Sequence, residues 1–142
     1  MRLRATVGMG VLLSVLAATG CASSTPPLTE VKGVVLLDGK PLAGVRVEFI
    51  PGDSADRRLP FSQAETDDNG RYELRCENNQ LGAVIGQHKV IVRRPSTRPA
   101  ADAPPPPSGP AIPVAYQSVL NTPLTVDVKA DQQSYDLVLK SK

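Results

Sequence analysis

Short segments in which apolar and polar residues alternate, separated by clusters of turn-forming residues, constrain this chain most strongly. In residues 71–77 the apolar side chains Tyr72, Leu74 and Cys76 take every second position, between charged ones. A period of two is typical of a β-strand that buries one face and exposes the other. No segment shows the period of 3.6 that an amphipathic helix needs. The sequence therefore predicts an all-β fold.

Seven segments are predicted to be strands: 31–37, 45–50, 61–66, 71–77, 88–94, 124–129 and 134–140. Turn signals lie between them, of which the clearest are Asp38-Gly39 and the run Asp-Asp-Asn-Gly at 67–70. An Asp-Gly pair between two apolar runs favours a tight hairpin. Seven short strands joined by frequent turns are typical of an immunoglobulin-like β-sandwich.

The first twenty residues have the composition of an export signal rather than of a strand. Arg2 and Arg4 precede an apolar stretch, 5–18, that carries no charge. Basic residues favour the cytoplasmic side of a membrane. The apolar stretch is shorter than the roughly 20 residues of a spanning helix and fits the core of a cleavable signal. We therefore expect residues 1–20 to be removed as a signal peptide.

The end of this leader, Ala-Thr-Gly-Cys at 18–21, resembles the lipobox of bacterial lipoproteins, with Ala18 where leucine is usual. Ala18 and Gly20 are small, as a signal peptidase requires, and Cys21 supplies a thiol that can form a thioether to diacylglycerol. The resemblance implies lipid attachment at Cys21. The alternative is an ordinary secretory signal, which would leave Cys21 a plain thiol.

Removal of the leader leaves 142 − 20, or 122, residues, which is the size of one domain. Arg2 and Arg4 leave with it, so the 16 basic residues become 14 and balance the 14 acidic ones. A neutral chain with no basic cluster argues against nucleic acid as a partner. We expect residues 21–29, which are polar and contain two prolines, to form a lipidated tether, and 30–142 to form the sandwich.

Eight of the fourteen prolines fall in 95–113, where they prevent ladder hydrogen bonds. Only residues 114–142 follow, too few to bury a core of their own. The last two strands must therefore return to the same sandwich, and 95–113 is predicted to be a solvated, stiff loop. A ligand for an aromatic groove is the alternative role of such a proline run.

Three stretches carry a family pattern. Residues 31–47 (VKGVVLLDGKPLAGVRV) match G-x-V-x-x-x-G-x-P-L-x-G-A-x-V except for Val45, residues 66–74 (TDDNGRYEL) match T-D-x-x-G-x-Y/F, and residues 86–90 (GQHKV) match G-x-Y-x-V with His88 in place of tyrosine. Together they resemble the carboxypeptidase regulatory-like family, whose domains share a transthyretin-like sandwich. The tail, with Ile-Pro-x-x-Tyr at 112–116 and Pro-Leu at 123–124, is similar to small lipoproteins of that family. The resemblance implies a transthyretin-like β-sandwich in the cell envelope, without catalytic activity.

The sequence contains no recognisable catalytic set, cofactor motif or metal motif. His88 is the only histidine, and we expect it to pack in the core rather than to bind a metal, because no second ligand is suitably spaced. Cys76 is expected to be a small buried hydrophobe. The run at 67–70 suggests calcium, but the twelfth position of such a loop is Asn78 instead of glutamate, which favours a turn.

One covalent possibility and three functional classes remain open. Lys32 and Asp136 lie on strands that related adhesin domains cross-link, but alternation turns Asp136 outward. We expect a non-catalytic lipoprotein, held to a membrane through Cys21 and facing the periplasm or exterior, that acts as a structural or interaction module with an envelope protein or glycan as partner. The alternative is a glycan- or peptide-binding module of the envelope. An enzyme is the weakest of the three.

Overall fold

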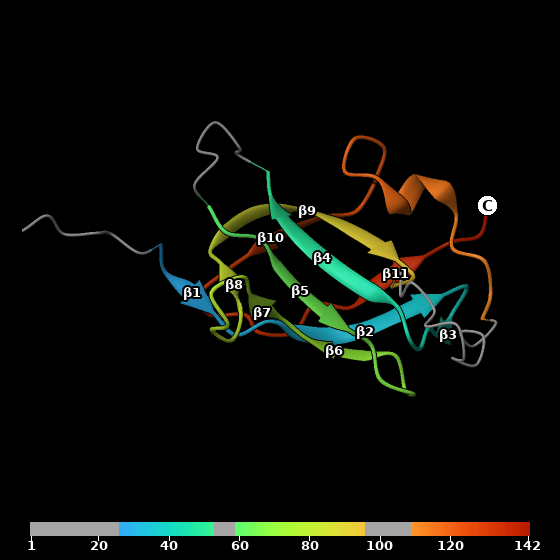
Figure 1. The fold of residues 1–142 in the computed structure, drawn as a ribbon, viewed down its shortest axis with the longest axis horizontal. Helices are drawn as coiled ribbons and strands as arrows, with labels where there is room; N and C mark the ends of the chain where they lie inside the picture. Colours follow the sequence, from blue (N-terminus) through green and yellow to red (C-terminus); the bar gives the residue numbers. More distant parts are fainter. Residues whose placement is uncertain (1–25, 53–58, 96–108) are drawn as a thin grey trace, which may run out of the picture.

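Two β-sheets pack face to face in the described part of the chain, which in the computed structural model comprises residues 26–52, 59–95 and 109–142 (Figure 1). The larger sheet has the strand order β10 (Thr125–Val128), β9 (Gly86–Arg93), β4 (Arg46–Pro51), β5 (Ser62–Glu65) and β7 (Arg75–Cys76). In the smaller sheet, β2 (Lys32–Leu37) pairs with β11 (Leu137–Leu139), β3 (Lys40–Pro41) and β6 (Arg71–Glu73). The predicted all-β sandwich is confirmed. The predicted signal peptide, 1–20, lies outside the described residues.

Each of the seven predicted segments overlaps a strand, and the inward positions are those that alternation indicates. Val47 and Phe49 on β4 are fully buried, as are Val45 just before it and Val90 and Val92 on β9. Asp38 and Gly39, with φ of 50° and 80°, join β2 and β3. The residues that flank this pair, Leu37 and Lys40, face each other across the ladder, so the turn is the expected two-residue hairpin.

The segment 71–77 differs from its prediction in one respect, because it is not a single strand. Its first half, β6, pairs with β2 of the smaller sheet, and its second half, β7, pairs with β5 of the larger one. The switch falls at Leu74, whose amide donates to the Val31 carbonyl. Because the two sheets share one core, the alternation continues through the switch, and Tyr72, Leu74 and Cys76 are all buried.

Two segments expected to lie outside the sandwich are partly built into it. β1 (Leu28–Thr29), at the end of the expected tether, pairs with β8 (Ala83–Val84). In the second segment, the expected solvated loop, Ile112 is buried in the core. The 3-10 helix η1 (Val114–Gln117), which follows it, adds Tyr116 to the core. Apolar side chains within polar or proline-rich sequence account for both differences, since each gains by burial. The loop residues 96–108 lie outside the described residues.

The last strand is held by the three tyrosines of the chain. The Tyr72 hydroxyl donates to the Tyr135 carbonyl at 2.5 Å. The Tyr135 hydroxyl accepts from the Lys129 amide at 2.8 Å, and the Tyr116 hydroxyl accepts from the Lys140 amide at 3.1 Å. Residues 129–140 are therefore fixed at their start, middle and end by phenol groups from three places in the sequence.

The Tyr72–Tyr135 bond requires a glycine in β2. Lys32 exchanges two parallel ladder bonds with residues 133 and 135, after which the Val34 amide would ordinarily donate to the Tyr135 carbonyl. It donates instead to the Asp136 carboxylate, at 3.1 Å. The freed Tyr135 carbonyl lies over the inner face of Gly33, so close that a Cβ there would be 2.0 Å from its oxygen.

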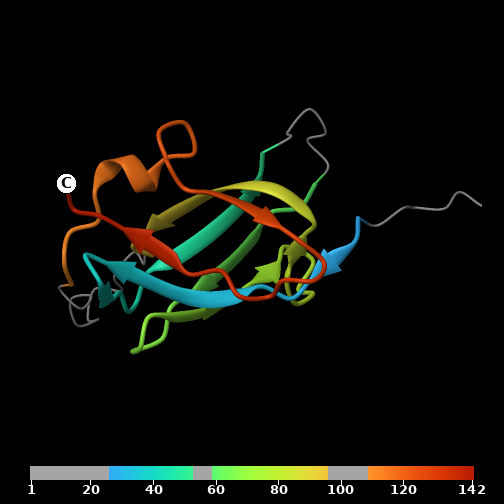
Figure 2. The ribbon, with the colours of Figure 1, turned by 180° about the vertical axis from the view of Figure 1, so that it is seen from behind.

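The chain leaves the sandwich at two opposite ends. β1 and β8 form a short ribbon at one end, and β11 carries the C-terminus to the other, where the strands β2 and β11 run side by side in the same direction (Figure 2).

We expect Tyr72→Phe to lower the free energy of unfolding by about 1–3 kcal/mol, because it leaves the buried Tyr135 carbonyl without a donor. Burial raises the pKa of the Tyr72 hydroxyl above its ordinary 10.0, so the group is a protonated phenol throughout the pH range of such a measurement. The matched control is Tyr116→Phe, which removes a partly buried bond and should cost about 0.5–1.5 kcal/mol. Urea unfolding of both variants measures the difference, and a cost at Tyr72 no larger than that at Tyr116 would contradict this account.

Candidate functional site

The segment Asp-Asp-Asn-Gly at 67–70 forms a turn that its first residue, Asp67, stabilises. One oxygen of the Asp67 carboxylate accepts from the amides of Asn69 and Arg71, at 2.9 and 2.8 Å, and the Gly70 amide donates to the Asp67 carbonyl. Within residues 26–52, 59–95 and 109–142, no group of three His, Cys, Asp or Glu side chains is placed to hold a metal ion. The hydrogen bonds of Asp67 confirm the predicted turn and engage its carboxylate in backbone contacts.

His88 lies on the inner face of β9 and is 1% exposed. Its Nδ1 is 2.9 Å from the Gly86 carbonyl, and its ring packs against Phe49 with 5.9 Å between centroids. Its Nε2 is buried without a hydrogen-bond partner among the described residues. Burial lowers the pKa of the imidazole below its ordinary 6.5, although the Gly86 carbonyl and the Asp127 carboxylate favour the charged ring. His88 is thus the packed core histidine that was predicted.

Cys76 and Asp136 also occupy structural positions. Cys76 is 3% exposed on the inner face of β7, as predicted, beside the buried Ser62 of β5. The Asp136 carboxylate points outward and accepts a hydrogen bond from the Val34 amide. This bond replaces the ladder bond that is missing beside Gly33. The predicted outward direction of Asp136 is confirmed. Cys21, the predicted lipid attachment site, lies outside the described residues.

A groove of about 440 Å³ lies on the outer face of the smaller sheet. It brings together side chains from β2, the turn before β6, β6 itself and the chain before β11. The polar residues that line it are Lys32, Asp67, Arg71, Glu73, Ser134 and Asp136. Charges of both signs line it, so the groove offers donors and acceptors together. The one aromatic residue on its wall, Tyr72, is buried and turns its ring to the core, so no exposed ring is present for a sugar to stack on.

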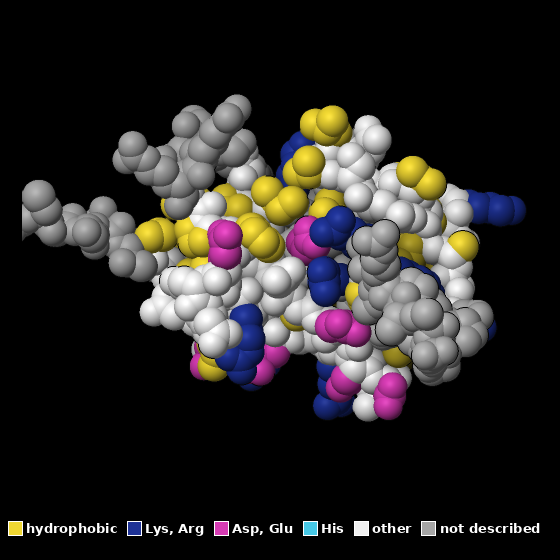
Figure 3. Space-filling model, viewed as in Figure 1, with side chains coloured by type: hydrophobic (Ala, Val, Ile, Leu, Met, Phe, Trp, Pro, Cys, Tyr) yellow, Lys and Arg dark blue, Asp and Glu magenta, His cyan; other side chains and the backbone are white. Residues whose placement is uncertain are grey.

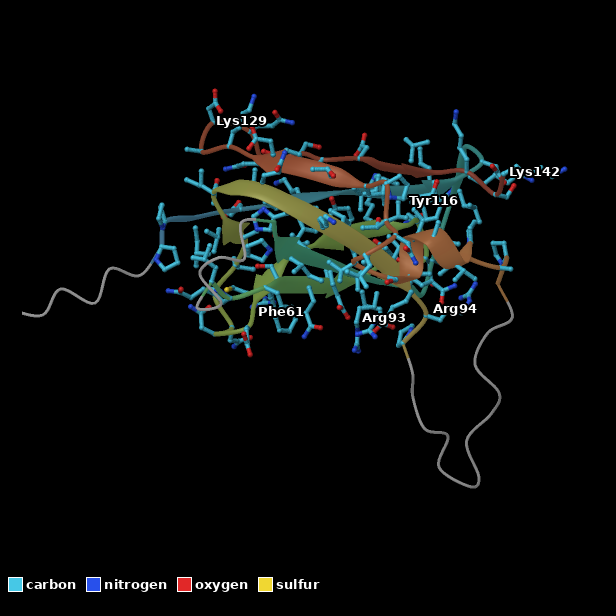
Figure 4. The ribbon with its side chains drawn as sticks, turned by 90° about the horizontal axis from the view of Figure 1, so that it is seen from above. Phe61, Arg93, Arg94, Tyr116, Lys129 and Lys142 are labelled. Atoms are coloured by element: carbon cyan, nitrogen blue, oxygen red, sulfur yellow. The ribbon has the colours of Figure 1, made fainter. Side chains whose placement is uncertain are left out.

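The outer face of the larger sheet has a charged half and an apolar half (Figure 3). In the charged half, Glu48 is only 7% exposed because the Arg93 guanidinium lies over it, with Nε 3.0 Å from the Glu48 carboxylate. Arg94, next along the chain, donates to the Pro110 carbonyl. Figure 4 shows Arg93 and Arg94 on the side of the sandwich where Phe61 also lies. Glu48 faces outward as alternation predicts, but the ion pair buries it.

The apolar half is at the end where β1 lies. We call Ile50, Leu59, Phe61 and Ile85 the apolar face. Ile50 and Phe61 are on the outer side of neighbouring strands, because the adjacent Phe49 and Ser62 pair across β4 and β5 and point inward. Leu59 and Ile85 line a hollow of about 400 Å³ beside them.

The apolar face is not among the features predicted above, although the sequence carries a signal for it. Ile50 is an apolar residue in an outward position of an alternating strand, and Phe61 precedes the inward Ser62 in the same way. An apolar side chain in an outward position is common on protein surfaces when it stands alone. The pairing of β4 with β5, which sequence does not reveal, places the two together.

Comparison with known proteins gives no match. No family model matches the chain, and neither a curated protein nor a solved structure matches it. Among the described residues, no helix is long and apolar enough to cross a membrane.

The buried His88 predicts a pH-dependent stability. Because its pKa is lowered in the folded state, the unfolded chain takes up the proton at a higher pH. The free energy of unfolding should therefore be constant above about pH 6.5 and should fall as the pH drops from there toward the folded-state pKa. Urea unfolding between about pH 7.5 and 5.5 measures this slope. His88→Phe should flatten it, since the chain has no other histidine, and an unchanged slope in that variant would assign the effect to another group.

Proposed function

We propose that this protein is a non-catalytic lipoprotein of the cell envelope, anchored through Cys21 and acting as a structural or interaction module. The observation that carries the proposal is the leader, in which two arginines, a short apolar stretch and small residues end at Cys21. A lipid on Cys21 would lie close to the folded domain, because β1 begins at Leu28, seven residues after Cys21. The domain would face the periplasm or the exterior, on the side to which the leader exports it.

The carboxypeptidase regulatory-like resemblance is part of this proposal. Three glycines of its motifs stand where the fold needs them: Gly33 under the Tyr135 carbonyl, and Gly39 and Gly70 at turns with φ of 80° and 73°. A side chain with a Cβ is strained at a positive φ. These positions support a transthyretin-like domain, and domains of that family accompany enzymes without catalysing a reaction themselves.

Lipidation at Cys21 is the direct test. Mass spectrometry of the mature N-terminal peptide should show Cys21 as the first residue, carrying two or three acyl chains, which anchor stably where one does not. Cys21→Ser should stop processing or release the protein from membranes. The matched control is Cys76→Ser, which changes a buried thiol and should leave the protein in the membrane fraction. A mature chain that starts elsewhere and keeps an unmodified Cys21 would overturn the proposal.

The second candidate function is binding of an envelope glycan or peptide in the groove of the smaller sheet. The observation in its favour is the row of charges of both signs in one open groove, from Lys32 and Arg71 to Glu73 and Asp136. Such a row suits an extended peptide, or a glycan that carries a peptide, better than a neutral sugar, because no exposed ring is present for stacking. It would serve the anchored protein as its contact with a partner.

A peptidoglycan fragment that carries its stem peptide is the probe for this function. In NMR titrations of the folded domain, binding should shift the amide signals of residues 32–34, 71–73 and 134–136. Replacing both Lys32 and Arg71 by alanine should weaken binding at least about fivefold, which corresponds to about 1 kcal/mol. The control is Lys89→Ala on the larger sheet, where the affinity should not change. Shifts confined to other residues, or none at all, would exclude this ligand from the groove.

A further inference from the structure

The apolar face lies on the outer side of the larger sheet, at the end of the sandwich where β1 pairs with β8. Its members Ile50, Leu59 and Phe61 are half-buried, and Ile85 is 36% exposed. Figure 3 shows apolar side chains side by side over this end of the larger sheet, with one acidic side chain among them. A contiguous apolar patch on one part of a protein surface marks a place of contact.

The start of the described chain is fastened to this face. The Ile85 amide donates to the Pro27 carbonyl at 3.1 Å, and Leu28 pairs with Val84. Six residue steps separate Pro27 from Cys21, and a fully extended chain of that length spans at most about 20 Å. Any lipid on Cys21 therefore keeps the bilayer surface within about 20 Å of Ile85.

This short connection decides what covers the apolar face. A tether of a few residues holds the face at a high effective concentration against the bilayer, so a weak apolar contact suffices for association. A soluble partner, or a second copy of the chain, has no such advantage. Of these candidates, the lipid surface is the one that the chain itself brings to the face.

We infer that the apolar face rests on the surface of the membrane in which Cys21 is anchored, with Phe61 and Ile85 in contact with lipid. The inference rests on the proposed function, since it needs the lipid on Cys21. The members of the face are apolar, and the charged residues beside it carry both signs: Lys89 pairs with Ile50 across β4 and β9, and the Glu77 amide donates to the Phe61 carbonyl. Contact should therefore be insensitive to salt.

Tryptophan fluorescence gives a direct test, because the chain contains no tryptophan. The lipidated protein is inserted into phosphatidylcholine vesicles whose acyl chains carry bromine, which quenches nearby tryptophan. The reporters are Phe61→Trp and Ile85→Trp, the second of which guards against misfolding of the first. The matched control is Val138→Trp on β11, 52% exposed on the outer face of the smaller sheet near the opposite end of the sandwich.

We expect at least twofold quenching at positions 61 and 85, unchanged in about 0.5 M salt, and none at 138. Vesicle-bound protein that shows no quenching at 61 and 85, or equal quenching at all three positions, would overturn the inference. A cross-linked dimer in which the tryptophans at 61 and 85 are not quenched would show that a second copy covers the face, and it would overturn the inference as well. Failure of the proposed function looks different, because protein with an unmodified Cys21 would not sediment with the vesicles at all.

Discussion

The hydrogen bond from the Tyr72 hydroxyl to the Tyr135 carbonyl is the contact on which the rest of the sandwich depends. It crosses β2 from the strand on one side, β6, to the chain on the other side that becomes β11. Two features make it possible: the absent side chain of Gly33 and the Asp136 carboxylate that takes over the Val34 amide. Each feature compensates for a cost created by another, since a buried carbonyl or amide without a partner is destabilising.

This arrangement explains why a last strand of three residues can complete the smaller sheet. β11 is short and pairs in parallel with β2, which alone gives few ladder bonds. The phenols of Tyr135 and Tyr116 add bonds to the amides of Lys129 and Lys140 on either side of it. The hydroxyl groups thus replace part of the ladder, and the rings fill the core between the sheets.

How much the sequence predicts depends on whether a feature is local. The inward positions of Tyr72, Leu74 and Cys76 follow from alternation, because the pleat imposes it on any strand. The switch of sheets at Leu74 does not follow, because the choice of pairing partner depends on β2 and β5, which are distant in the sequence. The burial of Ile112 was missed for the same reason: the proline-rich composition around it indicates a loop, whereas tertiary contacts decide where the loop ends.

The two proposed surfaces lie on opposite outer faces of one sandwich, and this fixes their relation. The apolar face is on the larger sheet, and the charged groove is on the smaller one. If the first rests on the bilayer, the second turns away from it, toward the space in which an envelope peptide or glycan would be met. The short connection from Cys21 would then do more than retain the protein at the membrane, because it would select which sheet faces the lipid and so leave the groove accessible. A longer tether would keep the anchor but weaken this selection, since the effective concentration of the apolar face at the membrane falls as the connection lengthens.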